Sequence, residues 1–423
     1  MADGLLNKAS IILTPTGYKA GTLYNVAPID EPYEDFDFAR TSTATRINSS
    51  GLVSNVATGV PRINYDSNGE NGHILLEPTS TNLITYSEDF SQWITQNATI
   101  TTTLQTAPDG SAYVDKYVGS TISQDLRNTS ASVNGTFTYS VFVKYINAPY
   151  IRLRAESTST WFNVQNGTIG TNNFDDASIQ SFGNGWYRIS VTNTTSATTF
   201  NDFYIHPHSI NNTTAEQDGG SFYAWGAQVE ALPYATSYIP TLTGSTETRA
   251  TETATGAGSA DLINSTEGVL YAEINALSYP TDLNSWLTIT DGTASNSVGI
   301  VFETTPYITG RVEVGGVNQA YLANNVDYSD FVKVAVKYKA NDFALWINGV
   351  EVATDTSGNT FSANTLNSLQ FSYGGGTNNW KGKVKALAVF NEALEDDELE
   401  LLTGVTNYGS FSELASANGY TII

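Results

Sequence analysis

Histidine is scarce in this sequence, which limits the chemistry that the chain can perform. The only histidines are His73, His206 and His208, and no Gly-x-Ser-x-Gly motif is present. A serine nucleophile activated by a histidine base is therefore poorly supported. His206 and His208 flank Pro207 and would place two imidazoles on one face of a strand. Because the sequence offers no obvious third ligand, the pair indicates a structural role more than a metal site.

Carboxylates, in contrast, are abundant, with 42 Asp and Glu residues. Glycoside hydrolysis requires two of them roughly 5–10 Å apart across a cleft, but in so acidic a chain the presence of a pair indicates little. The densest run, Glu395 to Glu400 (EDDELE), has helical spacing and is expected on the solvated face of a helix. We therefore interpret the protein as non-enzymatic, with a polysaccharide depolymerase as the alternative.

Tryptophan residues offer candidate ligand sites. Carbohydrate binding uses exposed aromatic faces, which stack on the CH groups of a sugar, beside amides and carboxylates that bond to its hydroxyls. Trp161 (in STSTWFN) and Trp380 (in GGGTNNWKG) have polar neighbours and are the candidate glycan ligands, together with Asn378 and Asn379. An exposed tryptophan at a contact between subunits is the alternative. The tryptophans that lie in apolar strands are expected in the core: Trp186, Trp225 and Trp346.

Composition and charge exclude several classes of partner. The net charge is −23, which repels phosphate backbones, and no basic cluster offsets it, so we expect no nucleic-acid binding. Only 14% of residues are charged, against roughly 25% in typical globular proteins. There is no Cys, which excludes disulfides and thiolate metal sites. The first residues, MADGLLNKAS, lack the features of a signal peptide, and no apolar run approaches the about 18 residues of a membrane span.

The elements that must position these residues are mostly strands. In the segment 331–352 (FVKVAVKYKANDFALWINGVEV) two apolar arms flank a polar turn, and Asn348-Gly349 favours a second tight reversal. Such strands cannot bury their own faces, so they predict a sandwich. Alternation over 137–145 (FTYSVFVKY) indicates a second sheet structure, and 392–402 has the spacing of a short helix. We expect an all-β protein with two antiparallel β-sandwich domains and one short helix.

Near the N-terminus, several short motifs occur in a fixed order: ARTSTATR, GLV, PR and LLEPTSTNL, within residues 36–85. This block, with the opening MADGLLNKASIILTPT, resembles a module of tailed-bacteriophage virion proteins. The resemblance covers about the first fifth of the chain and implies a structural protein of the particle, not a defined chemistry. Its arginines, Arg40, Arg46 and Arg62, are expected to form structural ion pairs or hydrogen bonds to carbonyls.

Two further resemblances concern the sandwiches. The stretch FYAWGAQVEALPYATSYIPT, preceded by GNGWYRISV, is similar to carbohydrate-binding-like jelly-roll modules of phage tail and fibre proteins. The pattern FVKVAVKY, DFALWINGVEV and WKGKVKALAVFNEALEDDELELL resembles the concanavalin A-like, laminin-G-type sandwich. That family often carries Ca²⁺ near a rim, so Asp291 (in TDGTASN) is the candidate metal ligand, with a plain turn as the alternative. No other cofactor is expected.

These observations predict five segments: a virion-attachment region at 1–85, a carbohydrate-binding-like jelly roll at 86–240, a linker at 241–258, a concanavalin A-like sandwich at 259–404 and a tail at 405–423, either a last strand or an inter-subunit contact. We expect a structural protein on the surface of a bacteriophage virion, as a tail fibre, head fibre or decoration protein. It would attach to other virion proteins through its N-terminal region and adhere to host or environmental glycans. By family analogy we expect a homotrimer. A purely architectural capsid or tail protein is a further alternative.

Overall fold

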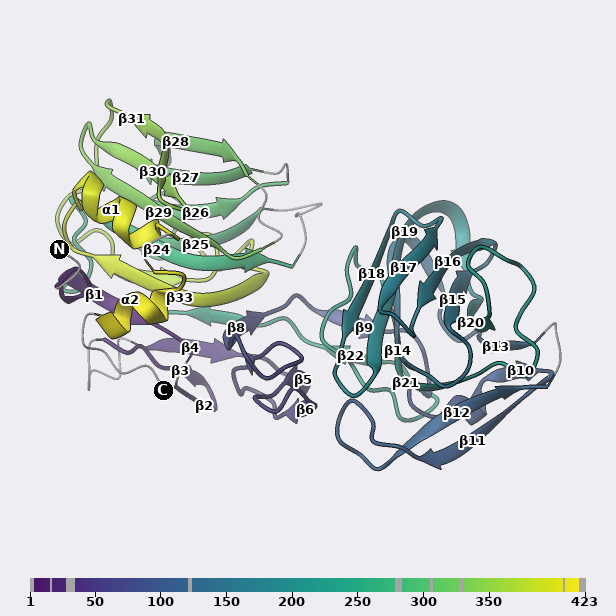
Figure 1. Cartoon of the computed structure of the whole chain (residues 1–423). Coiled ribbons are helices and arrows are strands. Elements are labelled where there is room, and N and C mark those ends of the chain that lie inside the picture. Colours follow the sequence, from purple (N-terminus) through teal and green to yellow (C-terminus); the bar gives the residue numbers. More distant parts are fainter. Residues whose placement is uncertain are drawn as a thin grey trace.

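The computed structural model describes residues 4–15, 17–27, 35–120, 124–277, 284–304, 307–326, 330–405 and 408–417. Its strands form two β-sandwiches that lie side by side and are joined by extended segments (Figure 1). Nearly all regular structure is β, which confirms the expected fold class. Within the described residues, none of the helices has the length and apolarity required to cross a bilayer.

The first sandwich consists of two six-stranded antiparallel sheets. Its core is rich in aromatic residues contributed by both sheets, among them Phe137, Tyr139, Phe162 and Phe203. In spatial order the first sheet contains β10 (Ile94–Gln96), β13 (Asp125–Asn128), β20 (Phe203–His208), β15 (Tyr150–Ala155), β16 (Thr158–Asn163) and β17 (Thr168–Asn172). The second contains β11 (Ala98–Leu104), β12 (Tyr113–Gly119), β21 (Ser221–Glu230), β14 (Val133–Tyr145), β19 (Trp186–Phe200) and β18 (Asp176–Ser181).

The second sandwich packs an eight-stranded sheet on a five-stranded sheet. The larger sheet contains β31 (Val350–Asp355), β30 (Phe343–Ile347), β29 (Val332–Lys339), β24 (Glu267–Ala276), β33 (Gly382–Phe390), β8 (His73–Leu76) and β7 (Ile63–Asn64), with β1 (Ala9–Leu13) also paired to β33. The smaller contains β28 (Val317–Asn325), β27 (Tyr307–Val314), β26 (Ser297–Phe302), β25 (Ser285–Thr290) and β32 (Ser368–Gln370).

Short elements complete the chain. α1 (Asp396–Thr403) and α2 (Phe411–Ala417) cover the outer face of the eight-stranded sheet, where they pack on residues such as Tyr271 and Trp346 (Figure 1). The remaining elements are η1 (Leu6–Lys8), η3 (Phe90–Gln92), β2 (Tyr18–Lys19), β3 (Thr22–Leu23), β4 (Phe36–Ala39), β5 (Ala44–Ile47), β6 (Val53–Val56), β9 (Ser80–Asn82), β22 (Glu247–Arg249) and β23 (Thr253–Thr255).

The predicted hairpin and helix are both present. β29 pairs with β30, and Asn348 and Gly349, both with positive φ, turn the chain into β31. A capping box between Glu395 and Glu398 starts α1, and its acidic residues lie mainly on the exposed face, as expected. A last strand is one of the two expectations for the tail. The structure has the helix α2 there instead, and its Phe411 ring stacks on the ring of Tyr271.

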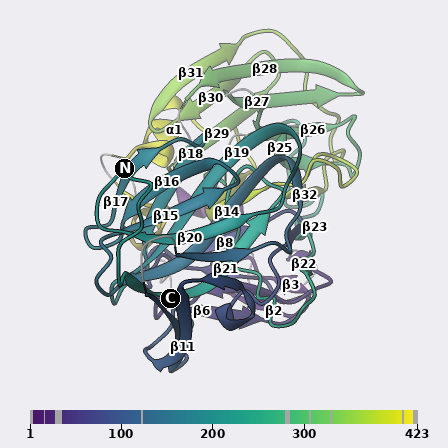
Figure 2. The same cartoon turned by 90° about the vertical axis from the view of Figure 1, so that its right-hand side faces the viewer.

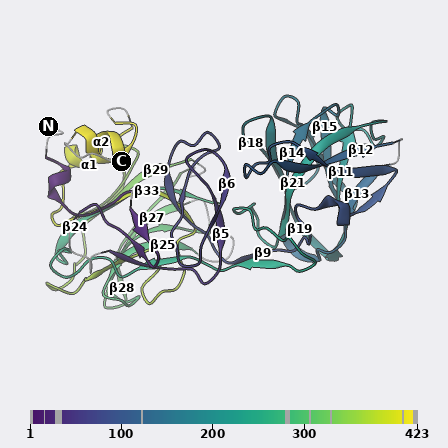
Figure 3. The same ribbon diagram turned by 90° about the horizontal axis from the view of Figure 1, so that it is seen from below.

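The topology is discontinuous in sequence. β1 and β8 lie on β33, so residues predicted as a separate N-terminal attachment region are strands of the C-terminal sandwich. The whole first sandwich is inserted between β9 and β22, which pair antiparallel, and a second pair, β4 and β23, lies next to them. Figure 3 shows the first sandwich beside the second and joined to it by these connections, and in Figure 2 the first sandwich lies in front of the second. The segment 241–258, predicted as a linker, therefore connects the sandwiches and also contributes two strands.

Candidate functional site

The two tryptophans expected to be exposed are buried. Trp161, in β16, is 5% exposed and lies between the guanidinium of Arg152 and the ring of His208. Trp380 is 1% exposed and packs on Phe302 in the core of the second sandwich. The expectation of exposure is wrong, because the polar residues before Trp380 form a turn that directs the next side chain inward. Trp186, Trp225 and Trp346 are buried, as predicted.

The other candidate residues lie in turns near Trp380. Asn378 adopts φ 49° in the bend that directly follows the bridge between Tyr373 and Thr377, and Asn379 forms a parallel bridge with Trp286. The carboxylate of Asp291 accepts hydrogen bonds from the backbone N–H and hydroxyl of Thr293, at 2.9 and 2.6 Å, and from the amide of Asn296. Burial raises the pKa of Asp291, but these bonds outweigh it and lower the pKa. Asp291 therefore has the hydrogen bonds of a plain turn, which is the alternative to a metal ligand.

Beside these turns the structure brings together a cluster that the sequence analysis did not identify. We call it the arginine–aromatic face; it lies on the outer side of the five-stranded sheet. Strand alternation places it there, because Leu287, Val312 and Leu322 point into the core and their neighbours point away from it. The members of the face are Trp286, Glu303, Arg311, Glu313, Tyr321 and Tyr373.

The face is held by stacking at its centre. The rings of Trp286 and Tyr373 are 4.1 Å apart, and the guanidinium of Arg311 lies 5.0 Å from the Trp286 ring and 5.8 Å from that of Tyr321. Glu313 joins the two halves, because it accepts from Arg311 Nη2 at 2.9 Å and from the Tyr373 hydroxyl at 2.6 Å. Burial, followed by this bond to the carboxylate, raises the pKa of Tyr373 to about 12.

Part of this face remains available to a ligand. Tyr321 is 49% exposed and donates its hydroxyl to Glu303 at 2.9 Å. Among the described residues, neither Trp286 Nε1 nor Arg311 Nε has a hydrogen-bond partner, although both atoms are buried. Buried donors are normally satisfied by protein, water or ligand. Trp286 is only 2% exposed, so the part of the face open to a ligand consists of the Tyr321 ring, the Arg311 guanidinium and the Glu303 carboxylate. An aromatic ring beside charged donors and acceptors can bind the CH groups and hydroxyls of a sugar.

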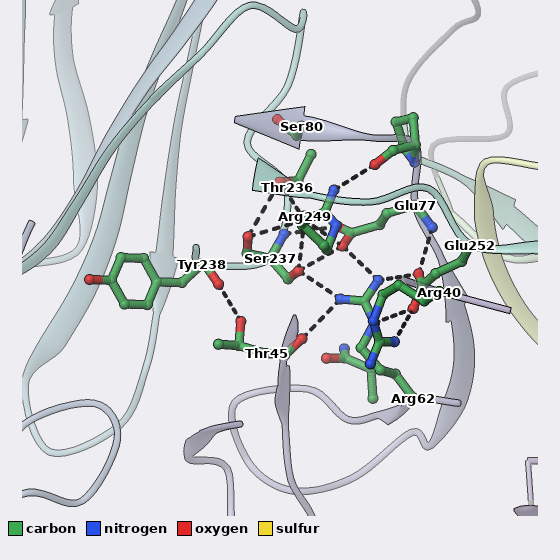
Figure 4. Close-up of polar contacts among 12 residues, drawn as sticks. Arg40, Thr45, Arg62, Glu77, Ser80, Thr236, Ser237, Tyr238, Arg249 and Glu252 are labelled. Carbon is green, nitrogen blue, oxygen red and sulfur yellow. Dashed lines mark hydrogen bonds and ion pairs between the residues drawn. The ribbon is translucent and has the colours of Figure 1, made fainter. Parts of the chain in front are cut away.

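The arginines of the N-terminal block form a separate, buried cluster. Arg62 pairs with Glu77 at 2.8 Å and with Glu252, Arg40 pairs with Glu252 at 2.7 Å, and Arg249 pairs with Glu77 at 3.0 Å (Figure 4). All five side chains are almost completely inaccessible to solvent. This confirms the structural role expected of Arg40 and Arg62.

Three residues of the cluster, Glu77, Arg249 and Glu252, belong to the neck, which we define as the β9–β22 pair with its flanking residues, 77–82 and 247–252. Arg40 and Arg62 pair with them from neighbouring segments. The cluster also contacts the end of the first sandwich, since Ser237 donates its N–H and hydroxyl to Glu77 at 2.8 and 2.6 Å. Arg62 and Arg249 bond to the same serine hydroxyl, at 2.7 and 3.1 Å. The neck is thus a polar joint between the sandwiches.

The histidine pair is also buried. His206 and His208 lie on one face of β20 with ring centroids 6.3 Å apart, and Glu216 is 3.6 Å from His206. Burial and the nearby Arg152 lower both pKa values, that of His208 to about 4, so both rings are neutral at pH 7. Among the described residues, no group of three or more His, Asp or Glu side chains is arranged to hold a metal ion.

The fold defines an all-β protein of two sandwiches whose C-terminal sandwich is concanavalin A-like. Residues 274–400 match the profile of the concanavalin A-like lectin/glucanases superfamily, of laminin G type. No curated protein sequence matches the chain.

Several solved structures are similar to about a third of the chain. A carbohydrate-binding module (CBM40) of the Ruminococcus gnavus IT-sialidase, bound to α2,3-sialyllactose, has 21% identity over 35% of this chain and 88% of its own, with a TM-score of 0.31. The leech intramolecular trans-sialidase has 23% identity over 34% of this chain and 24% of its own, with a TM-score of 0.28. A heptameric SAP-like pentraxin from Limulus polyphemus has 11% identity over 35% and 74%, with a TM-score of 0.29.

Proposed function

We propose that the protein is a non-enzymatic glycan-binding protein displayed on the surface of a bacteriophage virion. The observation that carries the glycan-binding part is the arginine–aromatic face, where the Arg311 guanidinium lies near the rings of Trp286 and Tyr321, and the Tyr321 ring is 49% exposed beside the Glu303 carboxylate. The concanavalin A-like match over residues 274–400 supports the same part. The virion part is supported by the resemblance of residues 36–85 to phage virion proteins.

Adhesion at such a face is expected to be weak for one copy and strong for a particle that displays many copies. A homotrimer would already raise the local number of sites. Attachment to other virion proteins would use a folded surface, because β1 and β8 are strands of the C-terminal sandwich and not a free arm. The ligands would be host-surface or environmental glycans.

The test of glycan binding uses an array of bacterial and algal glycans and the full-length protein. Arg311→Gln removes the guanidinium that lies over Trp286 and Tyr321 and should lower the affinity for any hit about tenfold, since hydrogen bonds to charged groups contribute roughly 1.5–3 kcal/mol. Lys339→Gln, in the same sandwich but paired with Glu267 at the exposed ends of β29 and β24, is the matched control and should bind as the wild type does. Equal binding by Arg311→Gln and the wild type would contradict the role of this face.

Labelling of purified particles tests the virion part. Antibodies against the protein should decorate intact virions at a regular position in electron micrographs, and absence of label would overturn the assignment. Release of reducing ends from the same glycans would instead favour the depolymerase alternative.

A specific observation favours a second candidate, the purely architectural role. Trp161 and Trp380 are buried, so neither ring is free to stack on a sugar. If the array gives no hit at all while virions are labelled, this architectural function replaces glycan binding.

A further inference from the structure

The two sandwiches enclose a cleft beside the neck, with a volume of about 610 Å³. One wall comes from the second sandwich and the other from the outer face of β18 and β19, on opposite sides of the gap between the bodies in Figure 1. The base contains residues of β5 and of the neck. The residues used below are Lys383, Lys385 and Phe331 on the first wall and Asp176, Ser178 and Gln180 on the second.

Two lysines on the first wall form no ion pair with any of the described residues. Lys383 and Lys385 lie at the start of β33, and within the described part of the chain neither forms an ion pair. The ammonium of Lys385 is 4.2 Å from the centre of the Phe331 ring. Burial lowers the pKa of Lys383, and the attraction of Glu77 and Asp330 opposes this shift without reversing it.

The other basic side chains of the cleft are already engaged. Arg46 donates to the Tyr18 hydroxyl at 2.8 Å and to a carbonyl, and Arg188 donates to the carbonyl of Thr236 at 2.8 Å. Burial lowers the pKa of His73 to about 4, so its ring is neutral at pH 7. In a chain of net charge −23, two free lysines side by side in a cleft are therefore a local exception.

The acidic groups that line the cleft form no direct ion pair with these lysines. Asp66 accepts from the backbone N–H groups of its own turn at 3.0 and 2.9 Å, and Glu77 belongs to the buried charge cluster. Asp176 is exposed on the opposite wall and faces Thr192 in the register of β18 and β19.

The second wall is a sheet face of short polar side chains. Cross-strand pairs join Asp176 to Thr192, Ser178 to Ser190 and Gln180 to Arg188, so alternate residues of both strands face the cleft. Hydroxyls, an amide and a carboxylate in a flat array provide both donors and acceptors for hydroxyl groups of a ligand. The cleft thus has a cationic, aromatic wall and a wall suited to hydroxyls.

We propose that this cleft binds a short acidic oligosaccharide, whose carboxylate or sulfate lies on Lys383 and Lys385 and whose hydroxyls bond to the β18–β19 wall. The inference rests on the proposed glycan-binding function and adds a second site and a ligand class. A short ligand fits better than a long polyanion, because the net charge of −23 repels extended negative charge while the lysines attract a single group nearby.

The experiment uses calorimetry with the full-length protein and three matched probes. The first is a disaccharide that ends in glucuronic acid, the second is its carboxyl-reduced counterpart, which ends in glucose, and the third is a sulfated form of the second. The wild type should bind the first or third about tenfold more tightly than the neutral second, and the preferred probe identifies the acidic group. A wild type without any preference for an acidic probe would overturn the inference.

The double variant Lys383→Gln/Lys385→Gln should lose this preference and bind the neutral probe as the wild type does. Lys381→Gln, two residues earlier and outside the cleft lining, is the matched control and should keep it. An unchanged preference in the double variant would contradict the cleft site.

Arg311→Gln separates the two proposals. If this variant abolishes hits on the array while the double variant changes nothing, the proposed function stands and the cleft site fails. If only the double variant loses binding, the cleft site stands and the arginine–aromatic face fails.

Discussion

At the scale of single residues, the charged side chains of the N-terminal motifs serve structure before recognition. Burial alone lowers the pKa of Arg62, but Glu252 and Glu77 more than compensate and raise it. Burial alone would raise the pKa of Glu77. The attraction of Arg249 and Arg62 and the hydrogen bonds from Ser237 outweigh burial and lower that pKa to about 2. Buried charges of this kind are stable only as a complete set, because each one left alone would lack both water and a partner.

Arg62→Met should therefore destabilise the protein strongly. Removing this guanidinium leaves the carboxylates of Glu77 and Glu252 with less positive charge in a site closed to water, and breaking a buried pair typically costs about 3–5 kcal/mol. Urea unfolding followed by tryptophan fluorescence measures the change. Arg46→Met is the control from the same motif; its guanidinium bonds to neutral groups, so a cost of about 1 kcal/mol is expected. Equal losses would refute the special role of the cluster.

Sequence could predict some of these positions and not others. Arg40 and Arg62 stand out in an acidic chain, and their structural role followed from that. Arg311 gives no such signal in GRVEVGG, because alternation shows that it shares a face with Glu313 but not which face is turned away from the core. Trp380 was misjudged because burial depends on where the turn at Asn378 directs the chain, and not on the polarity of sequence neighbours.

At the scale of elements, the β-rich segments were predictable and their pairing was not. The hairpin from β29 to β31 has a local signal in alternation and in Asn348-Gly349, so it followed from the sequence. The pairs β1–β33 and β9–β22 join residues more than a hundred positions apart, and short strands carry no record of a distant partner. The segment 241–258 has the composition of a linker because its buried residues are charged, such as Arg249 and Glu252, or small, such as Ala254 and Ala257, and none is a large apolar residue.

This topology predicts that the first sandwich can be removed. Asn82 and Glu247 are partners in the β9–β22 register, so replacing residues 83–246 by Asn-Gly should close a hairpin there. The shortened protein should unfold cooperatively on heating, although less stably, because Glu77 loses its bonds from Ser237. A control in which the same dipeptide also replaces Ser80–Asn82 removes β9 and should lose the cooperative transition. Identical melting of the two variants would show that the β9–β22 pair does not organise the neck.

At the scale of the whole molecule, acid should destabilise both sandwiches through their buried histidines. His73 lies in the second sandwich, where its Nδ1 bonds to the carbonyl of Asn71 at 2.9 Å and its Nε2 accepts from the Asn64 amide at 3.1 Å. That arrangement requires a neutral ring. His206 and His208 are in the first sandwich, and burial lowers the pKa values of all three, those of His73 and His208 to about 4.

The direction of the effect follows from proton binding. An unfolded histidine has a pKa of about 6.5, so between pH 6.5 and 4 the unfolded chain takes up protons that the folded chain does not. The contribution of the neutral, buried histidines to the free energy of unfolding is fully present above pH 6.5. It is lost as the pH falls to about 4, by up to roughly 3 kcal/mol for His73. Glu77, with its pKa lowered to about 2, adds a second loss below about pH 4.5.

Urea midpoints at pH 7, 5.5 and 4 should therefore fall steadily, and His73→Gln should reduce the slope between pH 6.5 and 4. Acid also reduces the net charge of −23 and with it the repulsion within the chain, which acts in the opposite direction. That effect is nearly the same in the wild type and the variant, so the difference between their slopes isolates the histidine. The replacement loses some stability at pH 7, and the prediction concerns only the dependence on pH. Parallel profiles for the two proteins would show that His73 does not couple folding to pH.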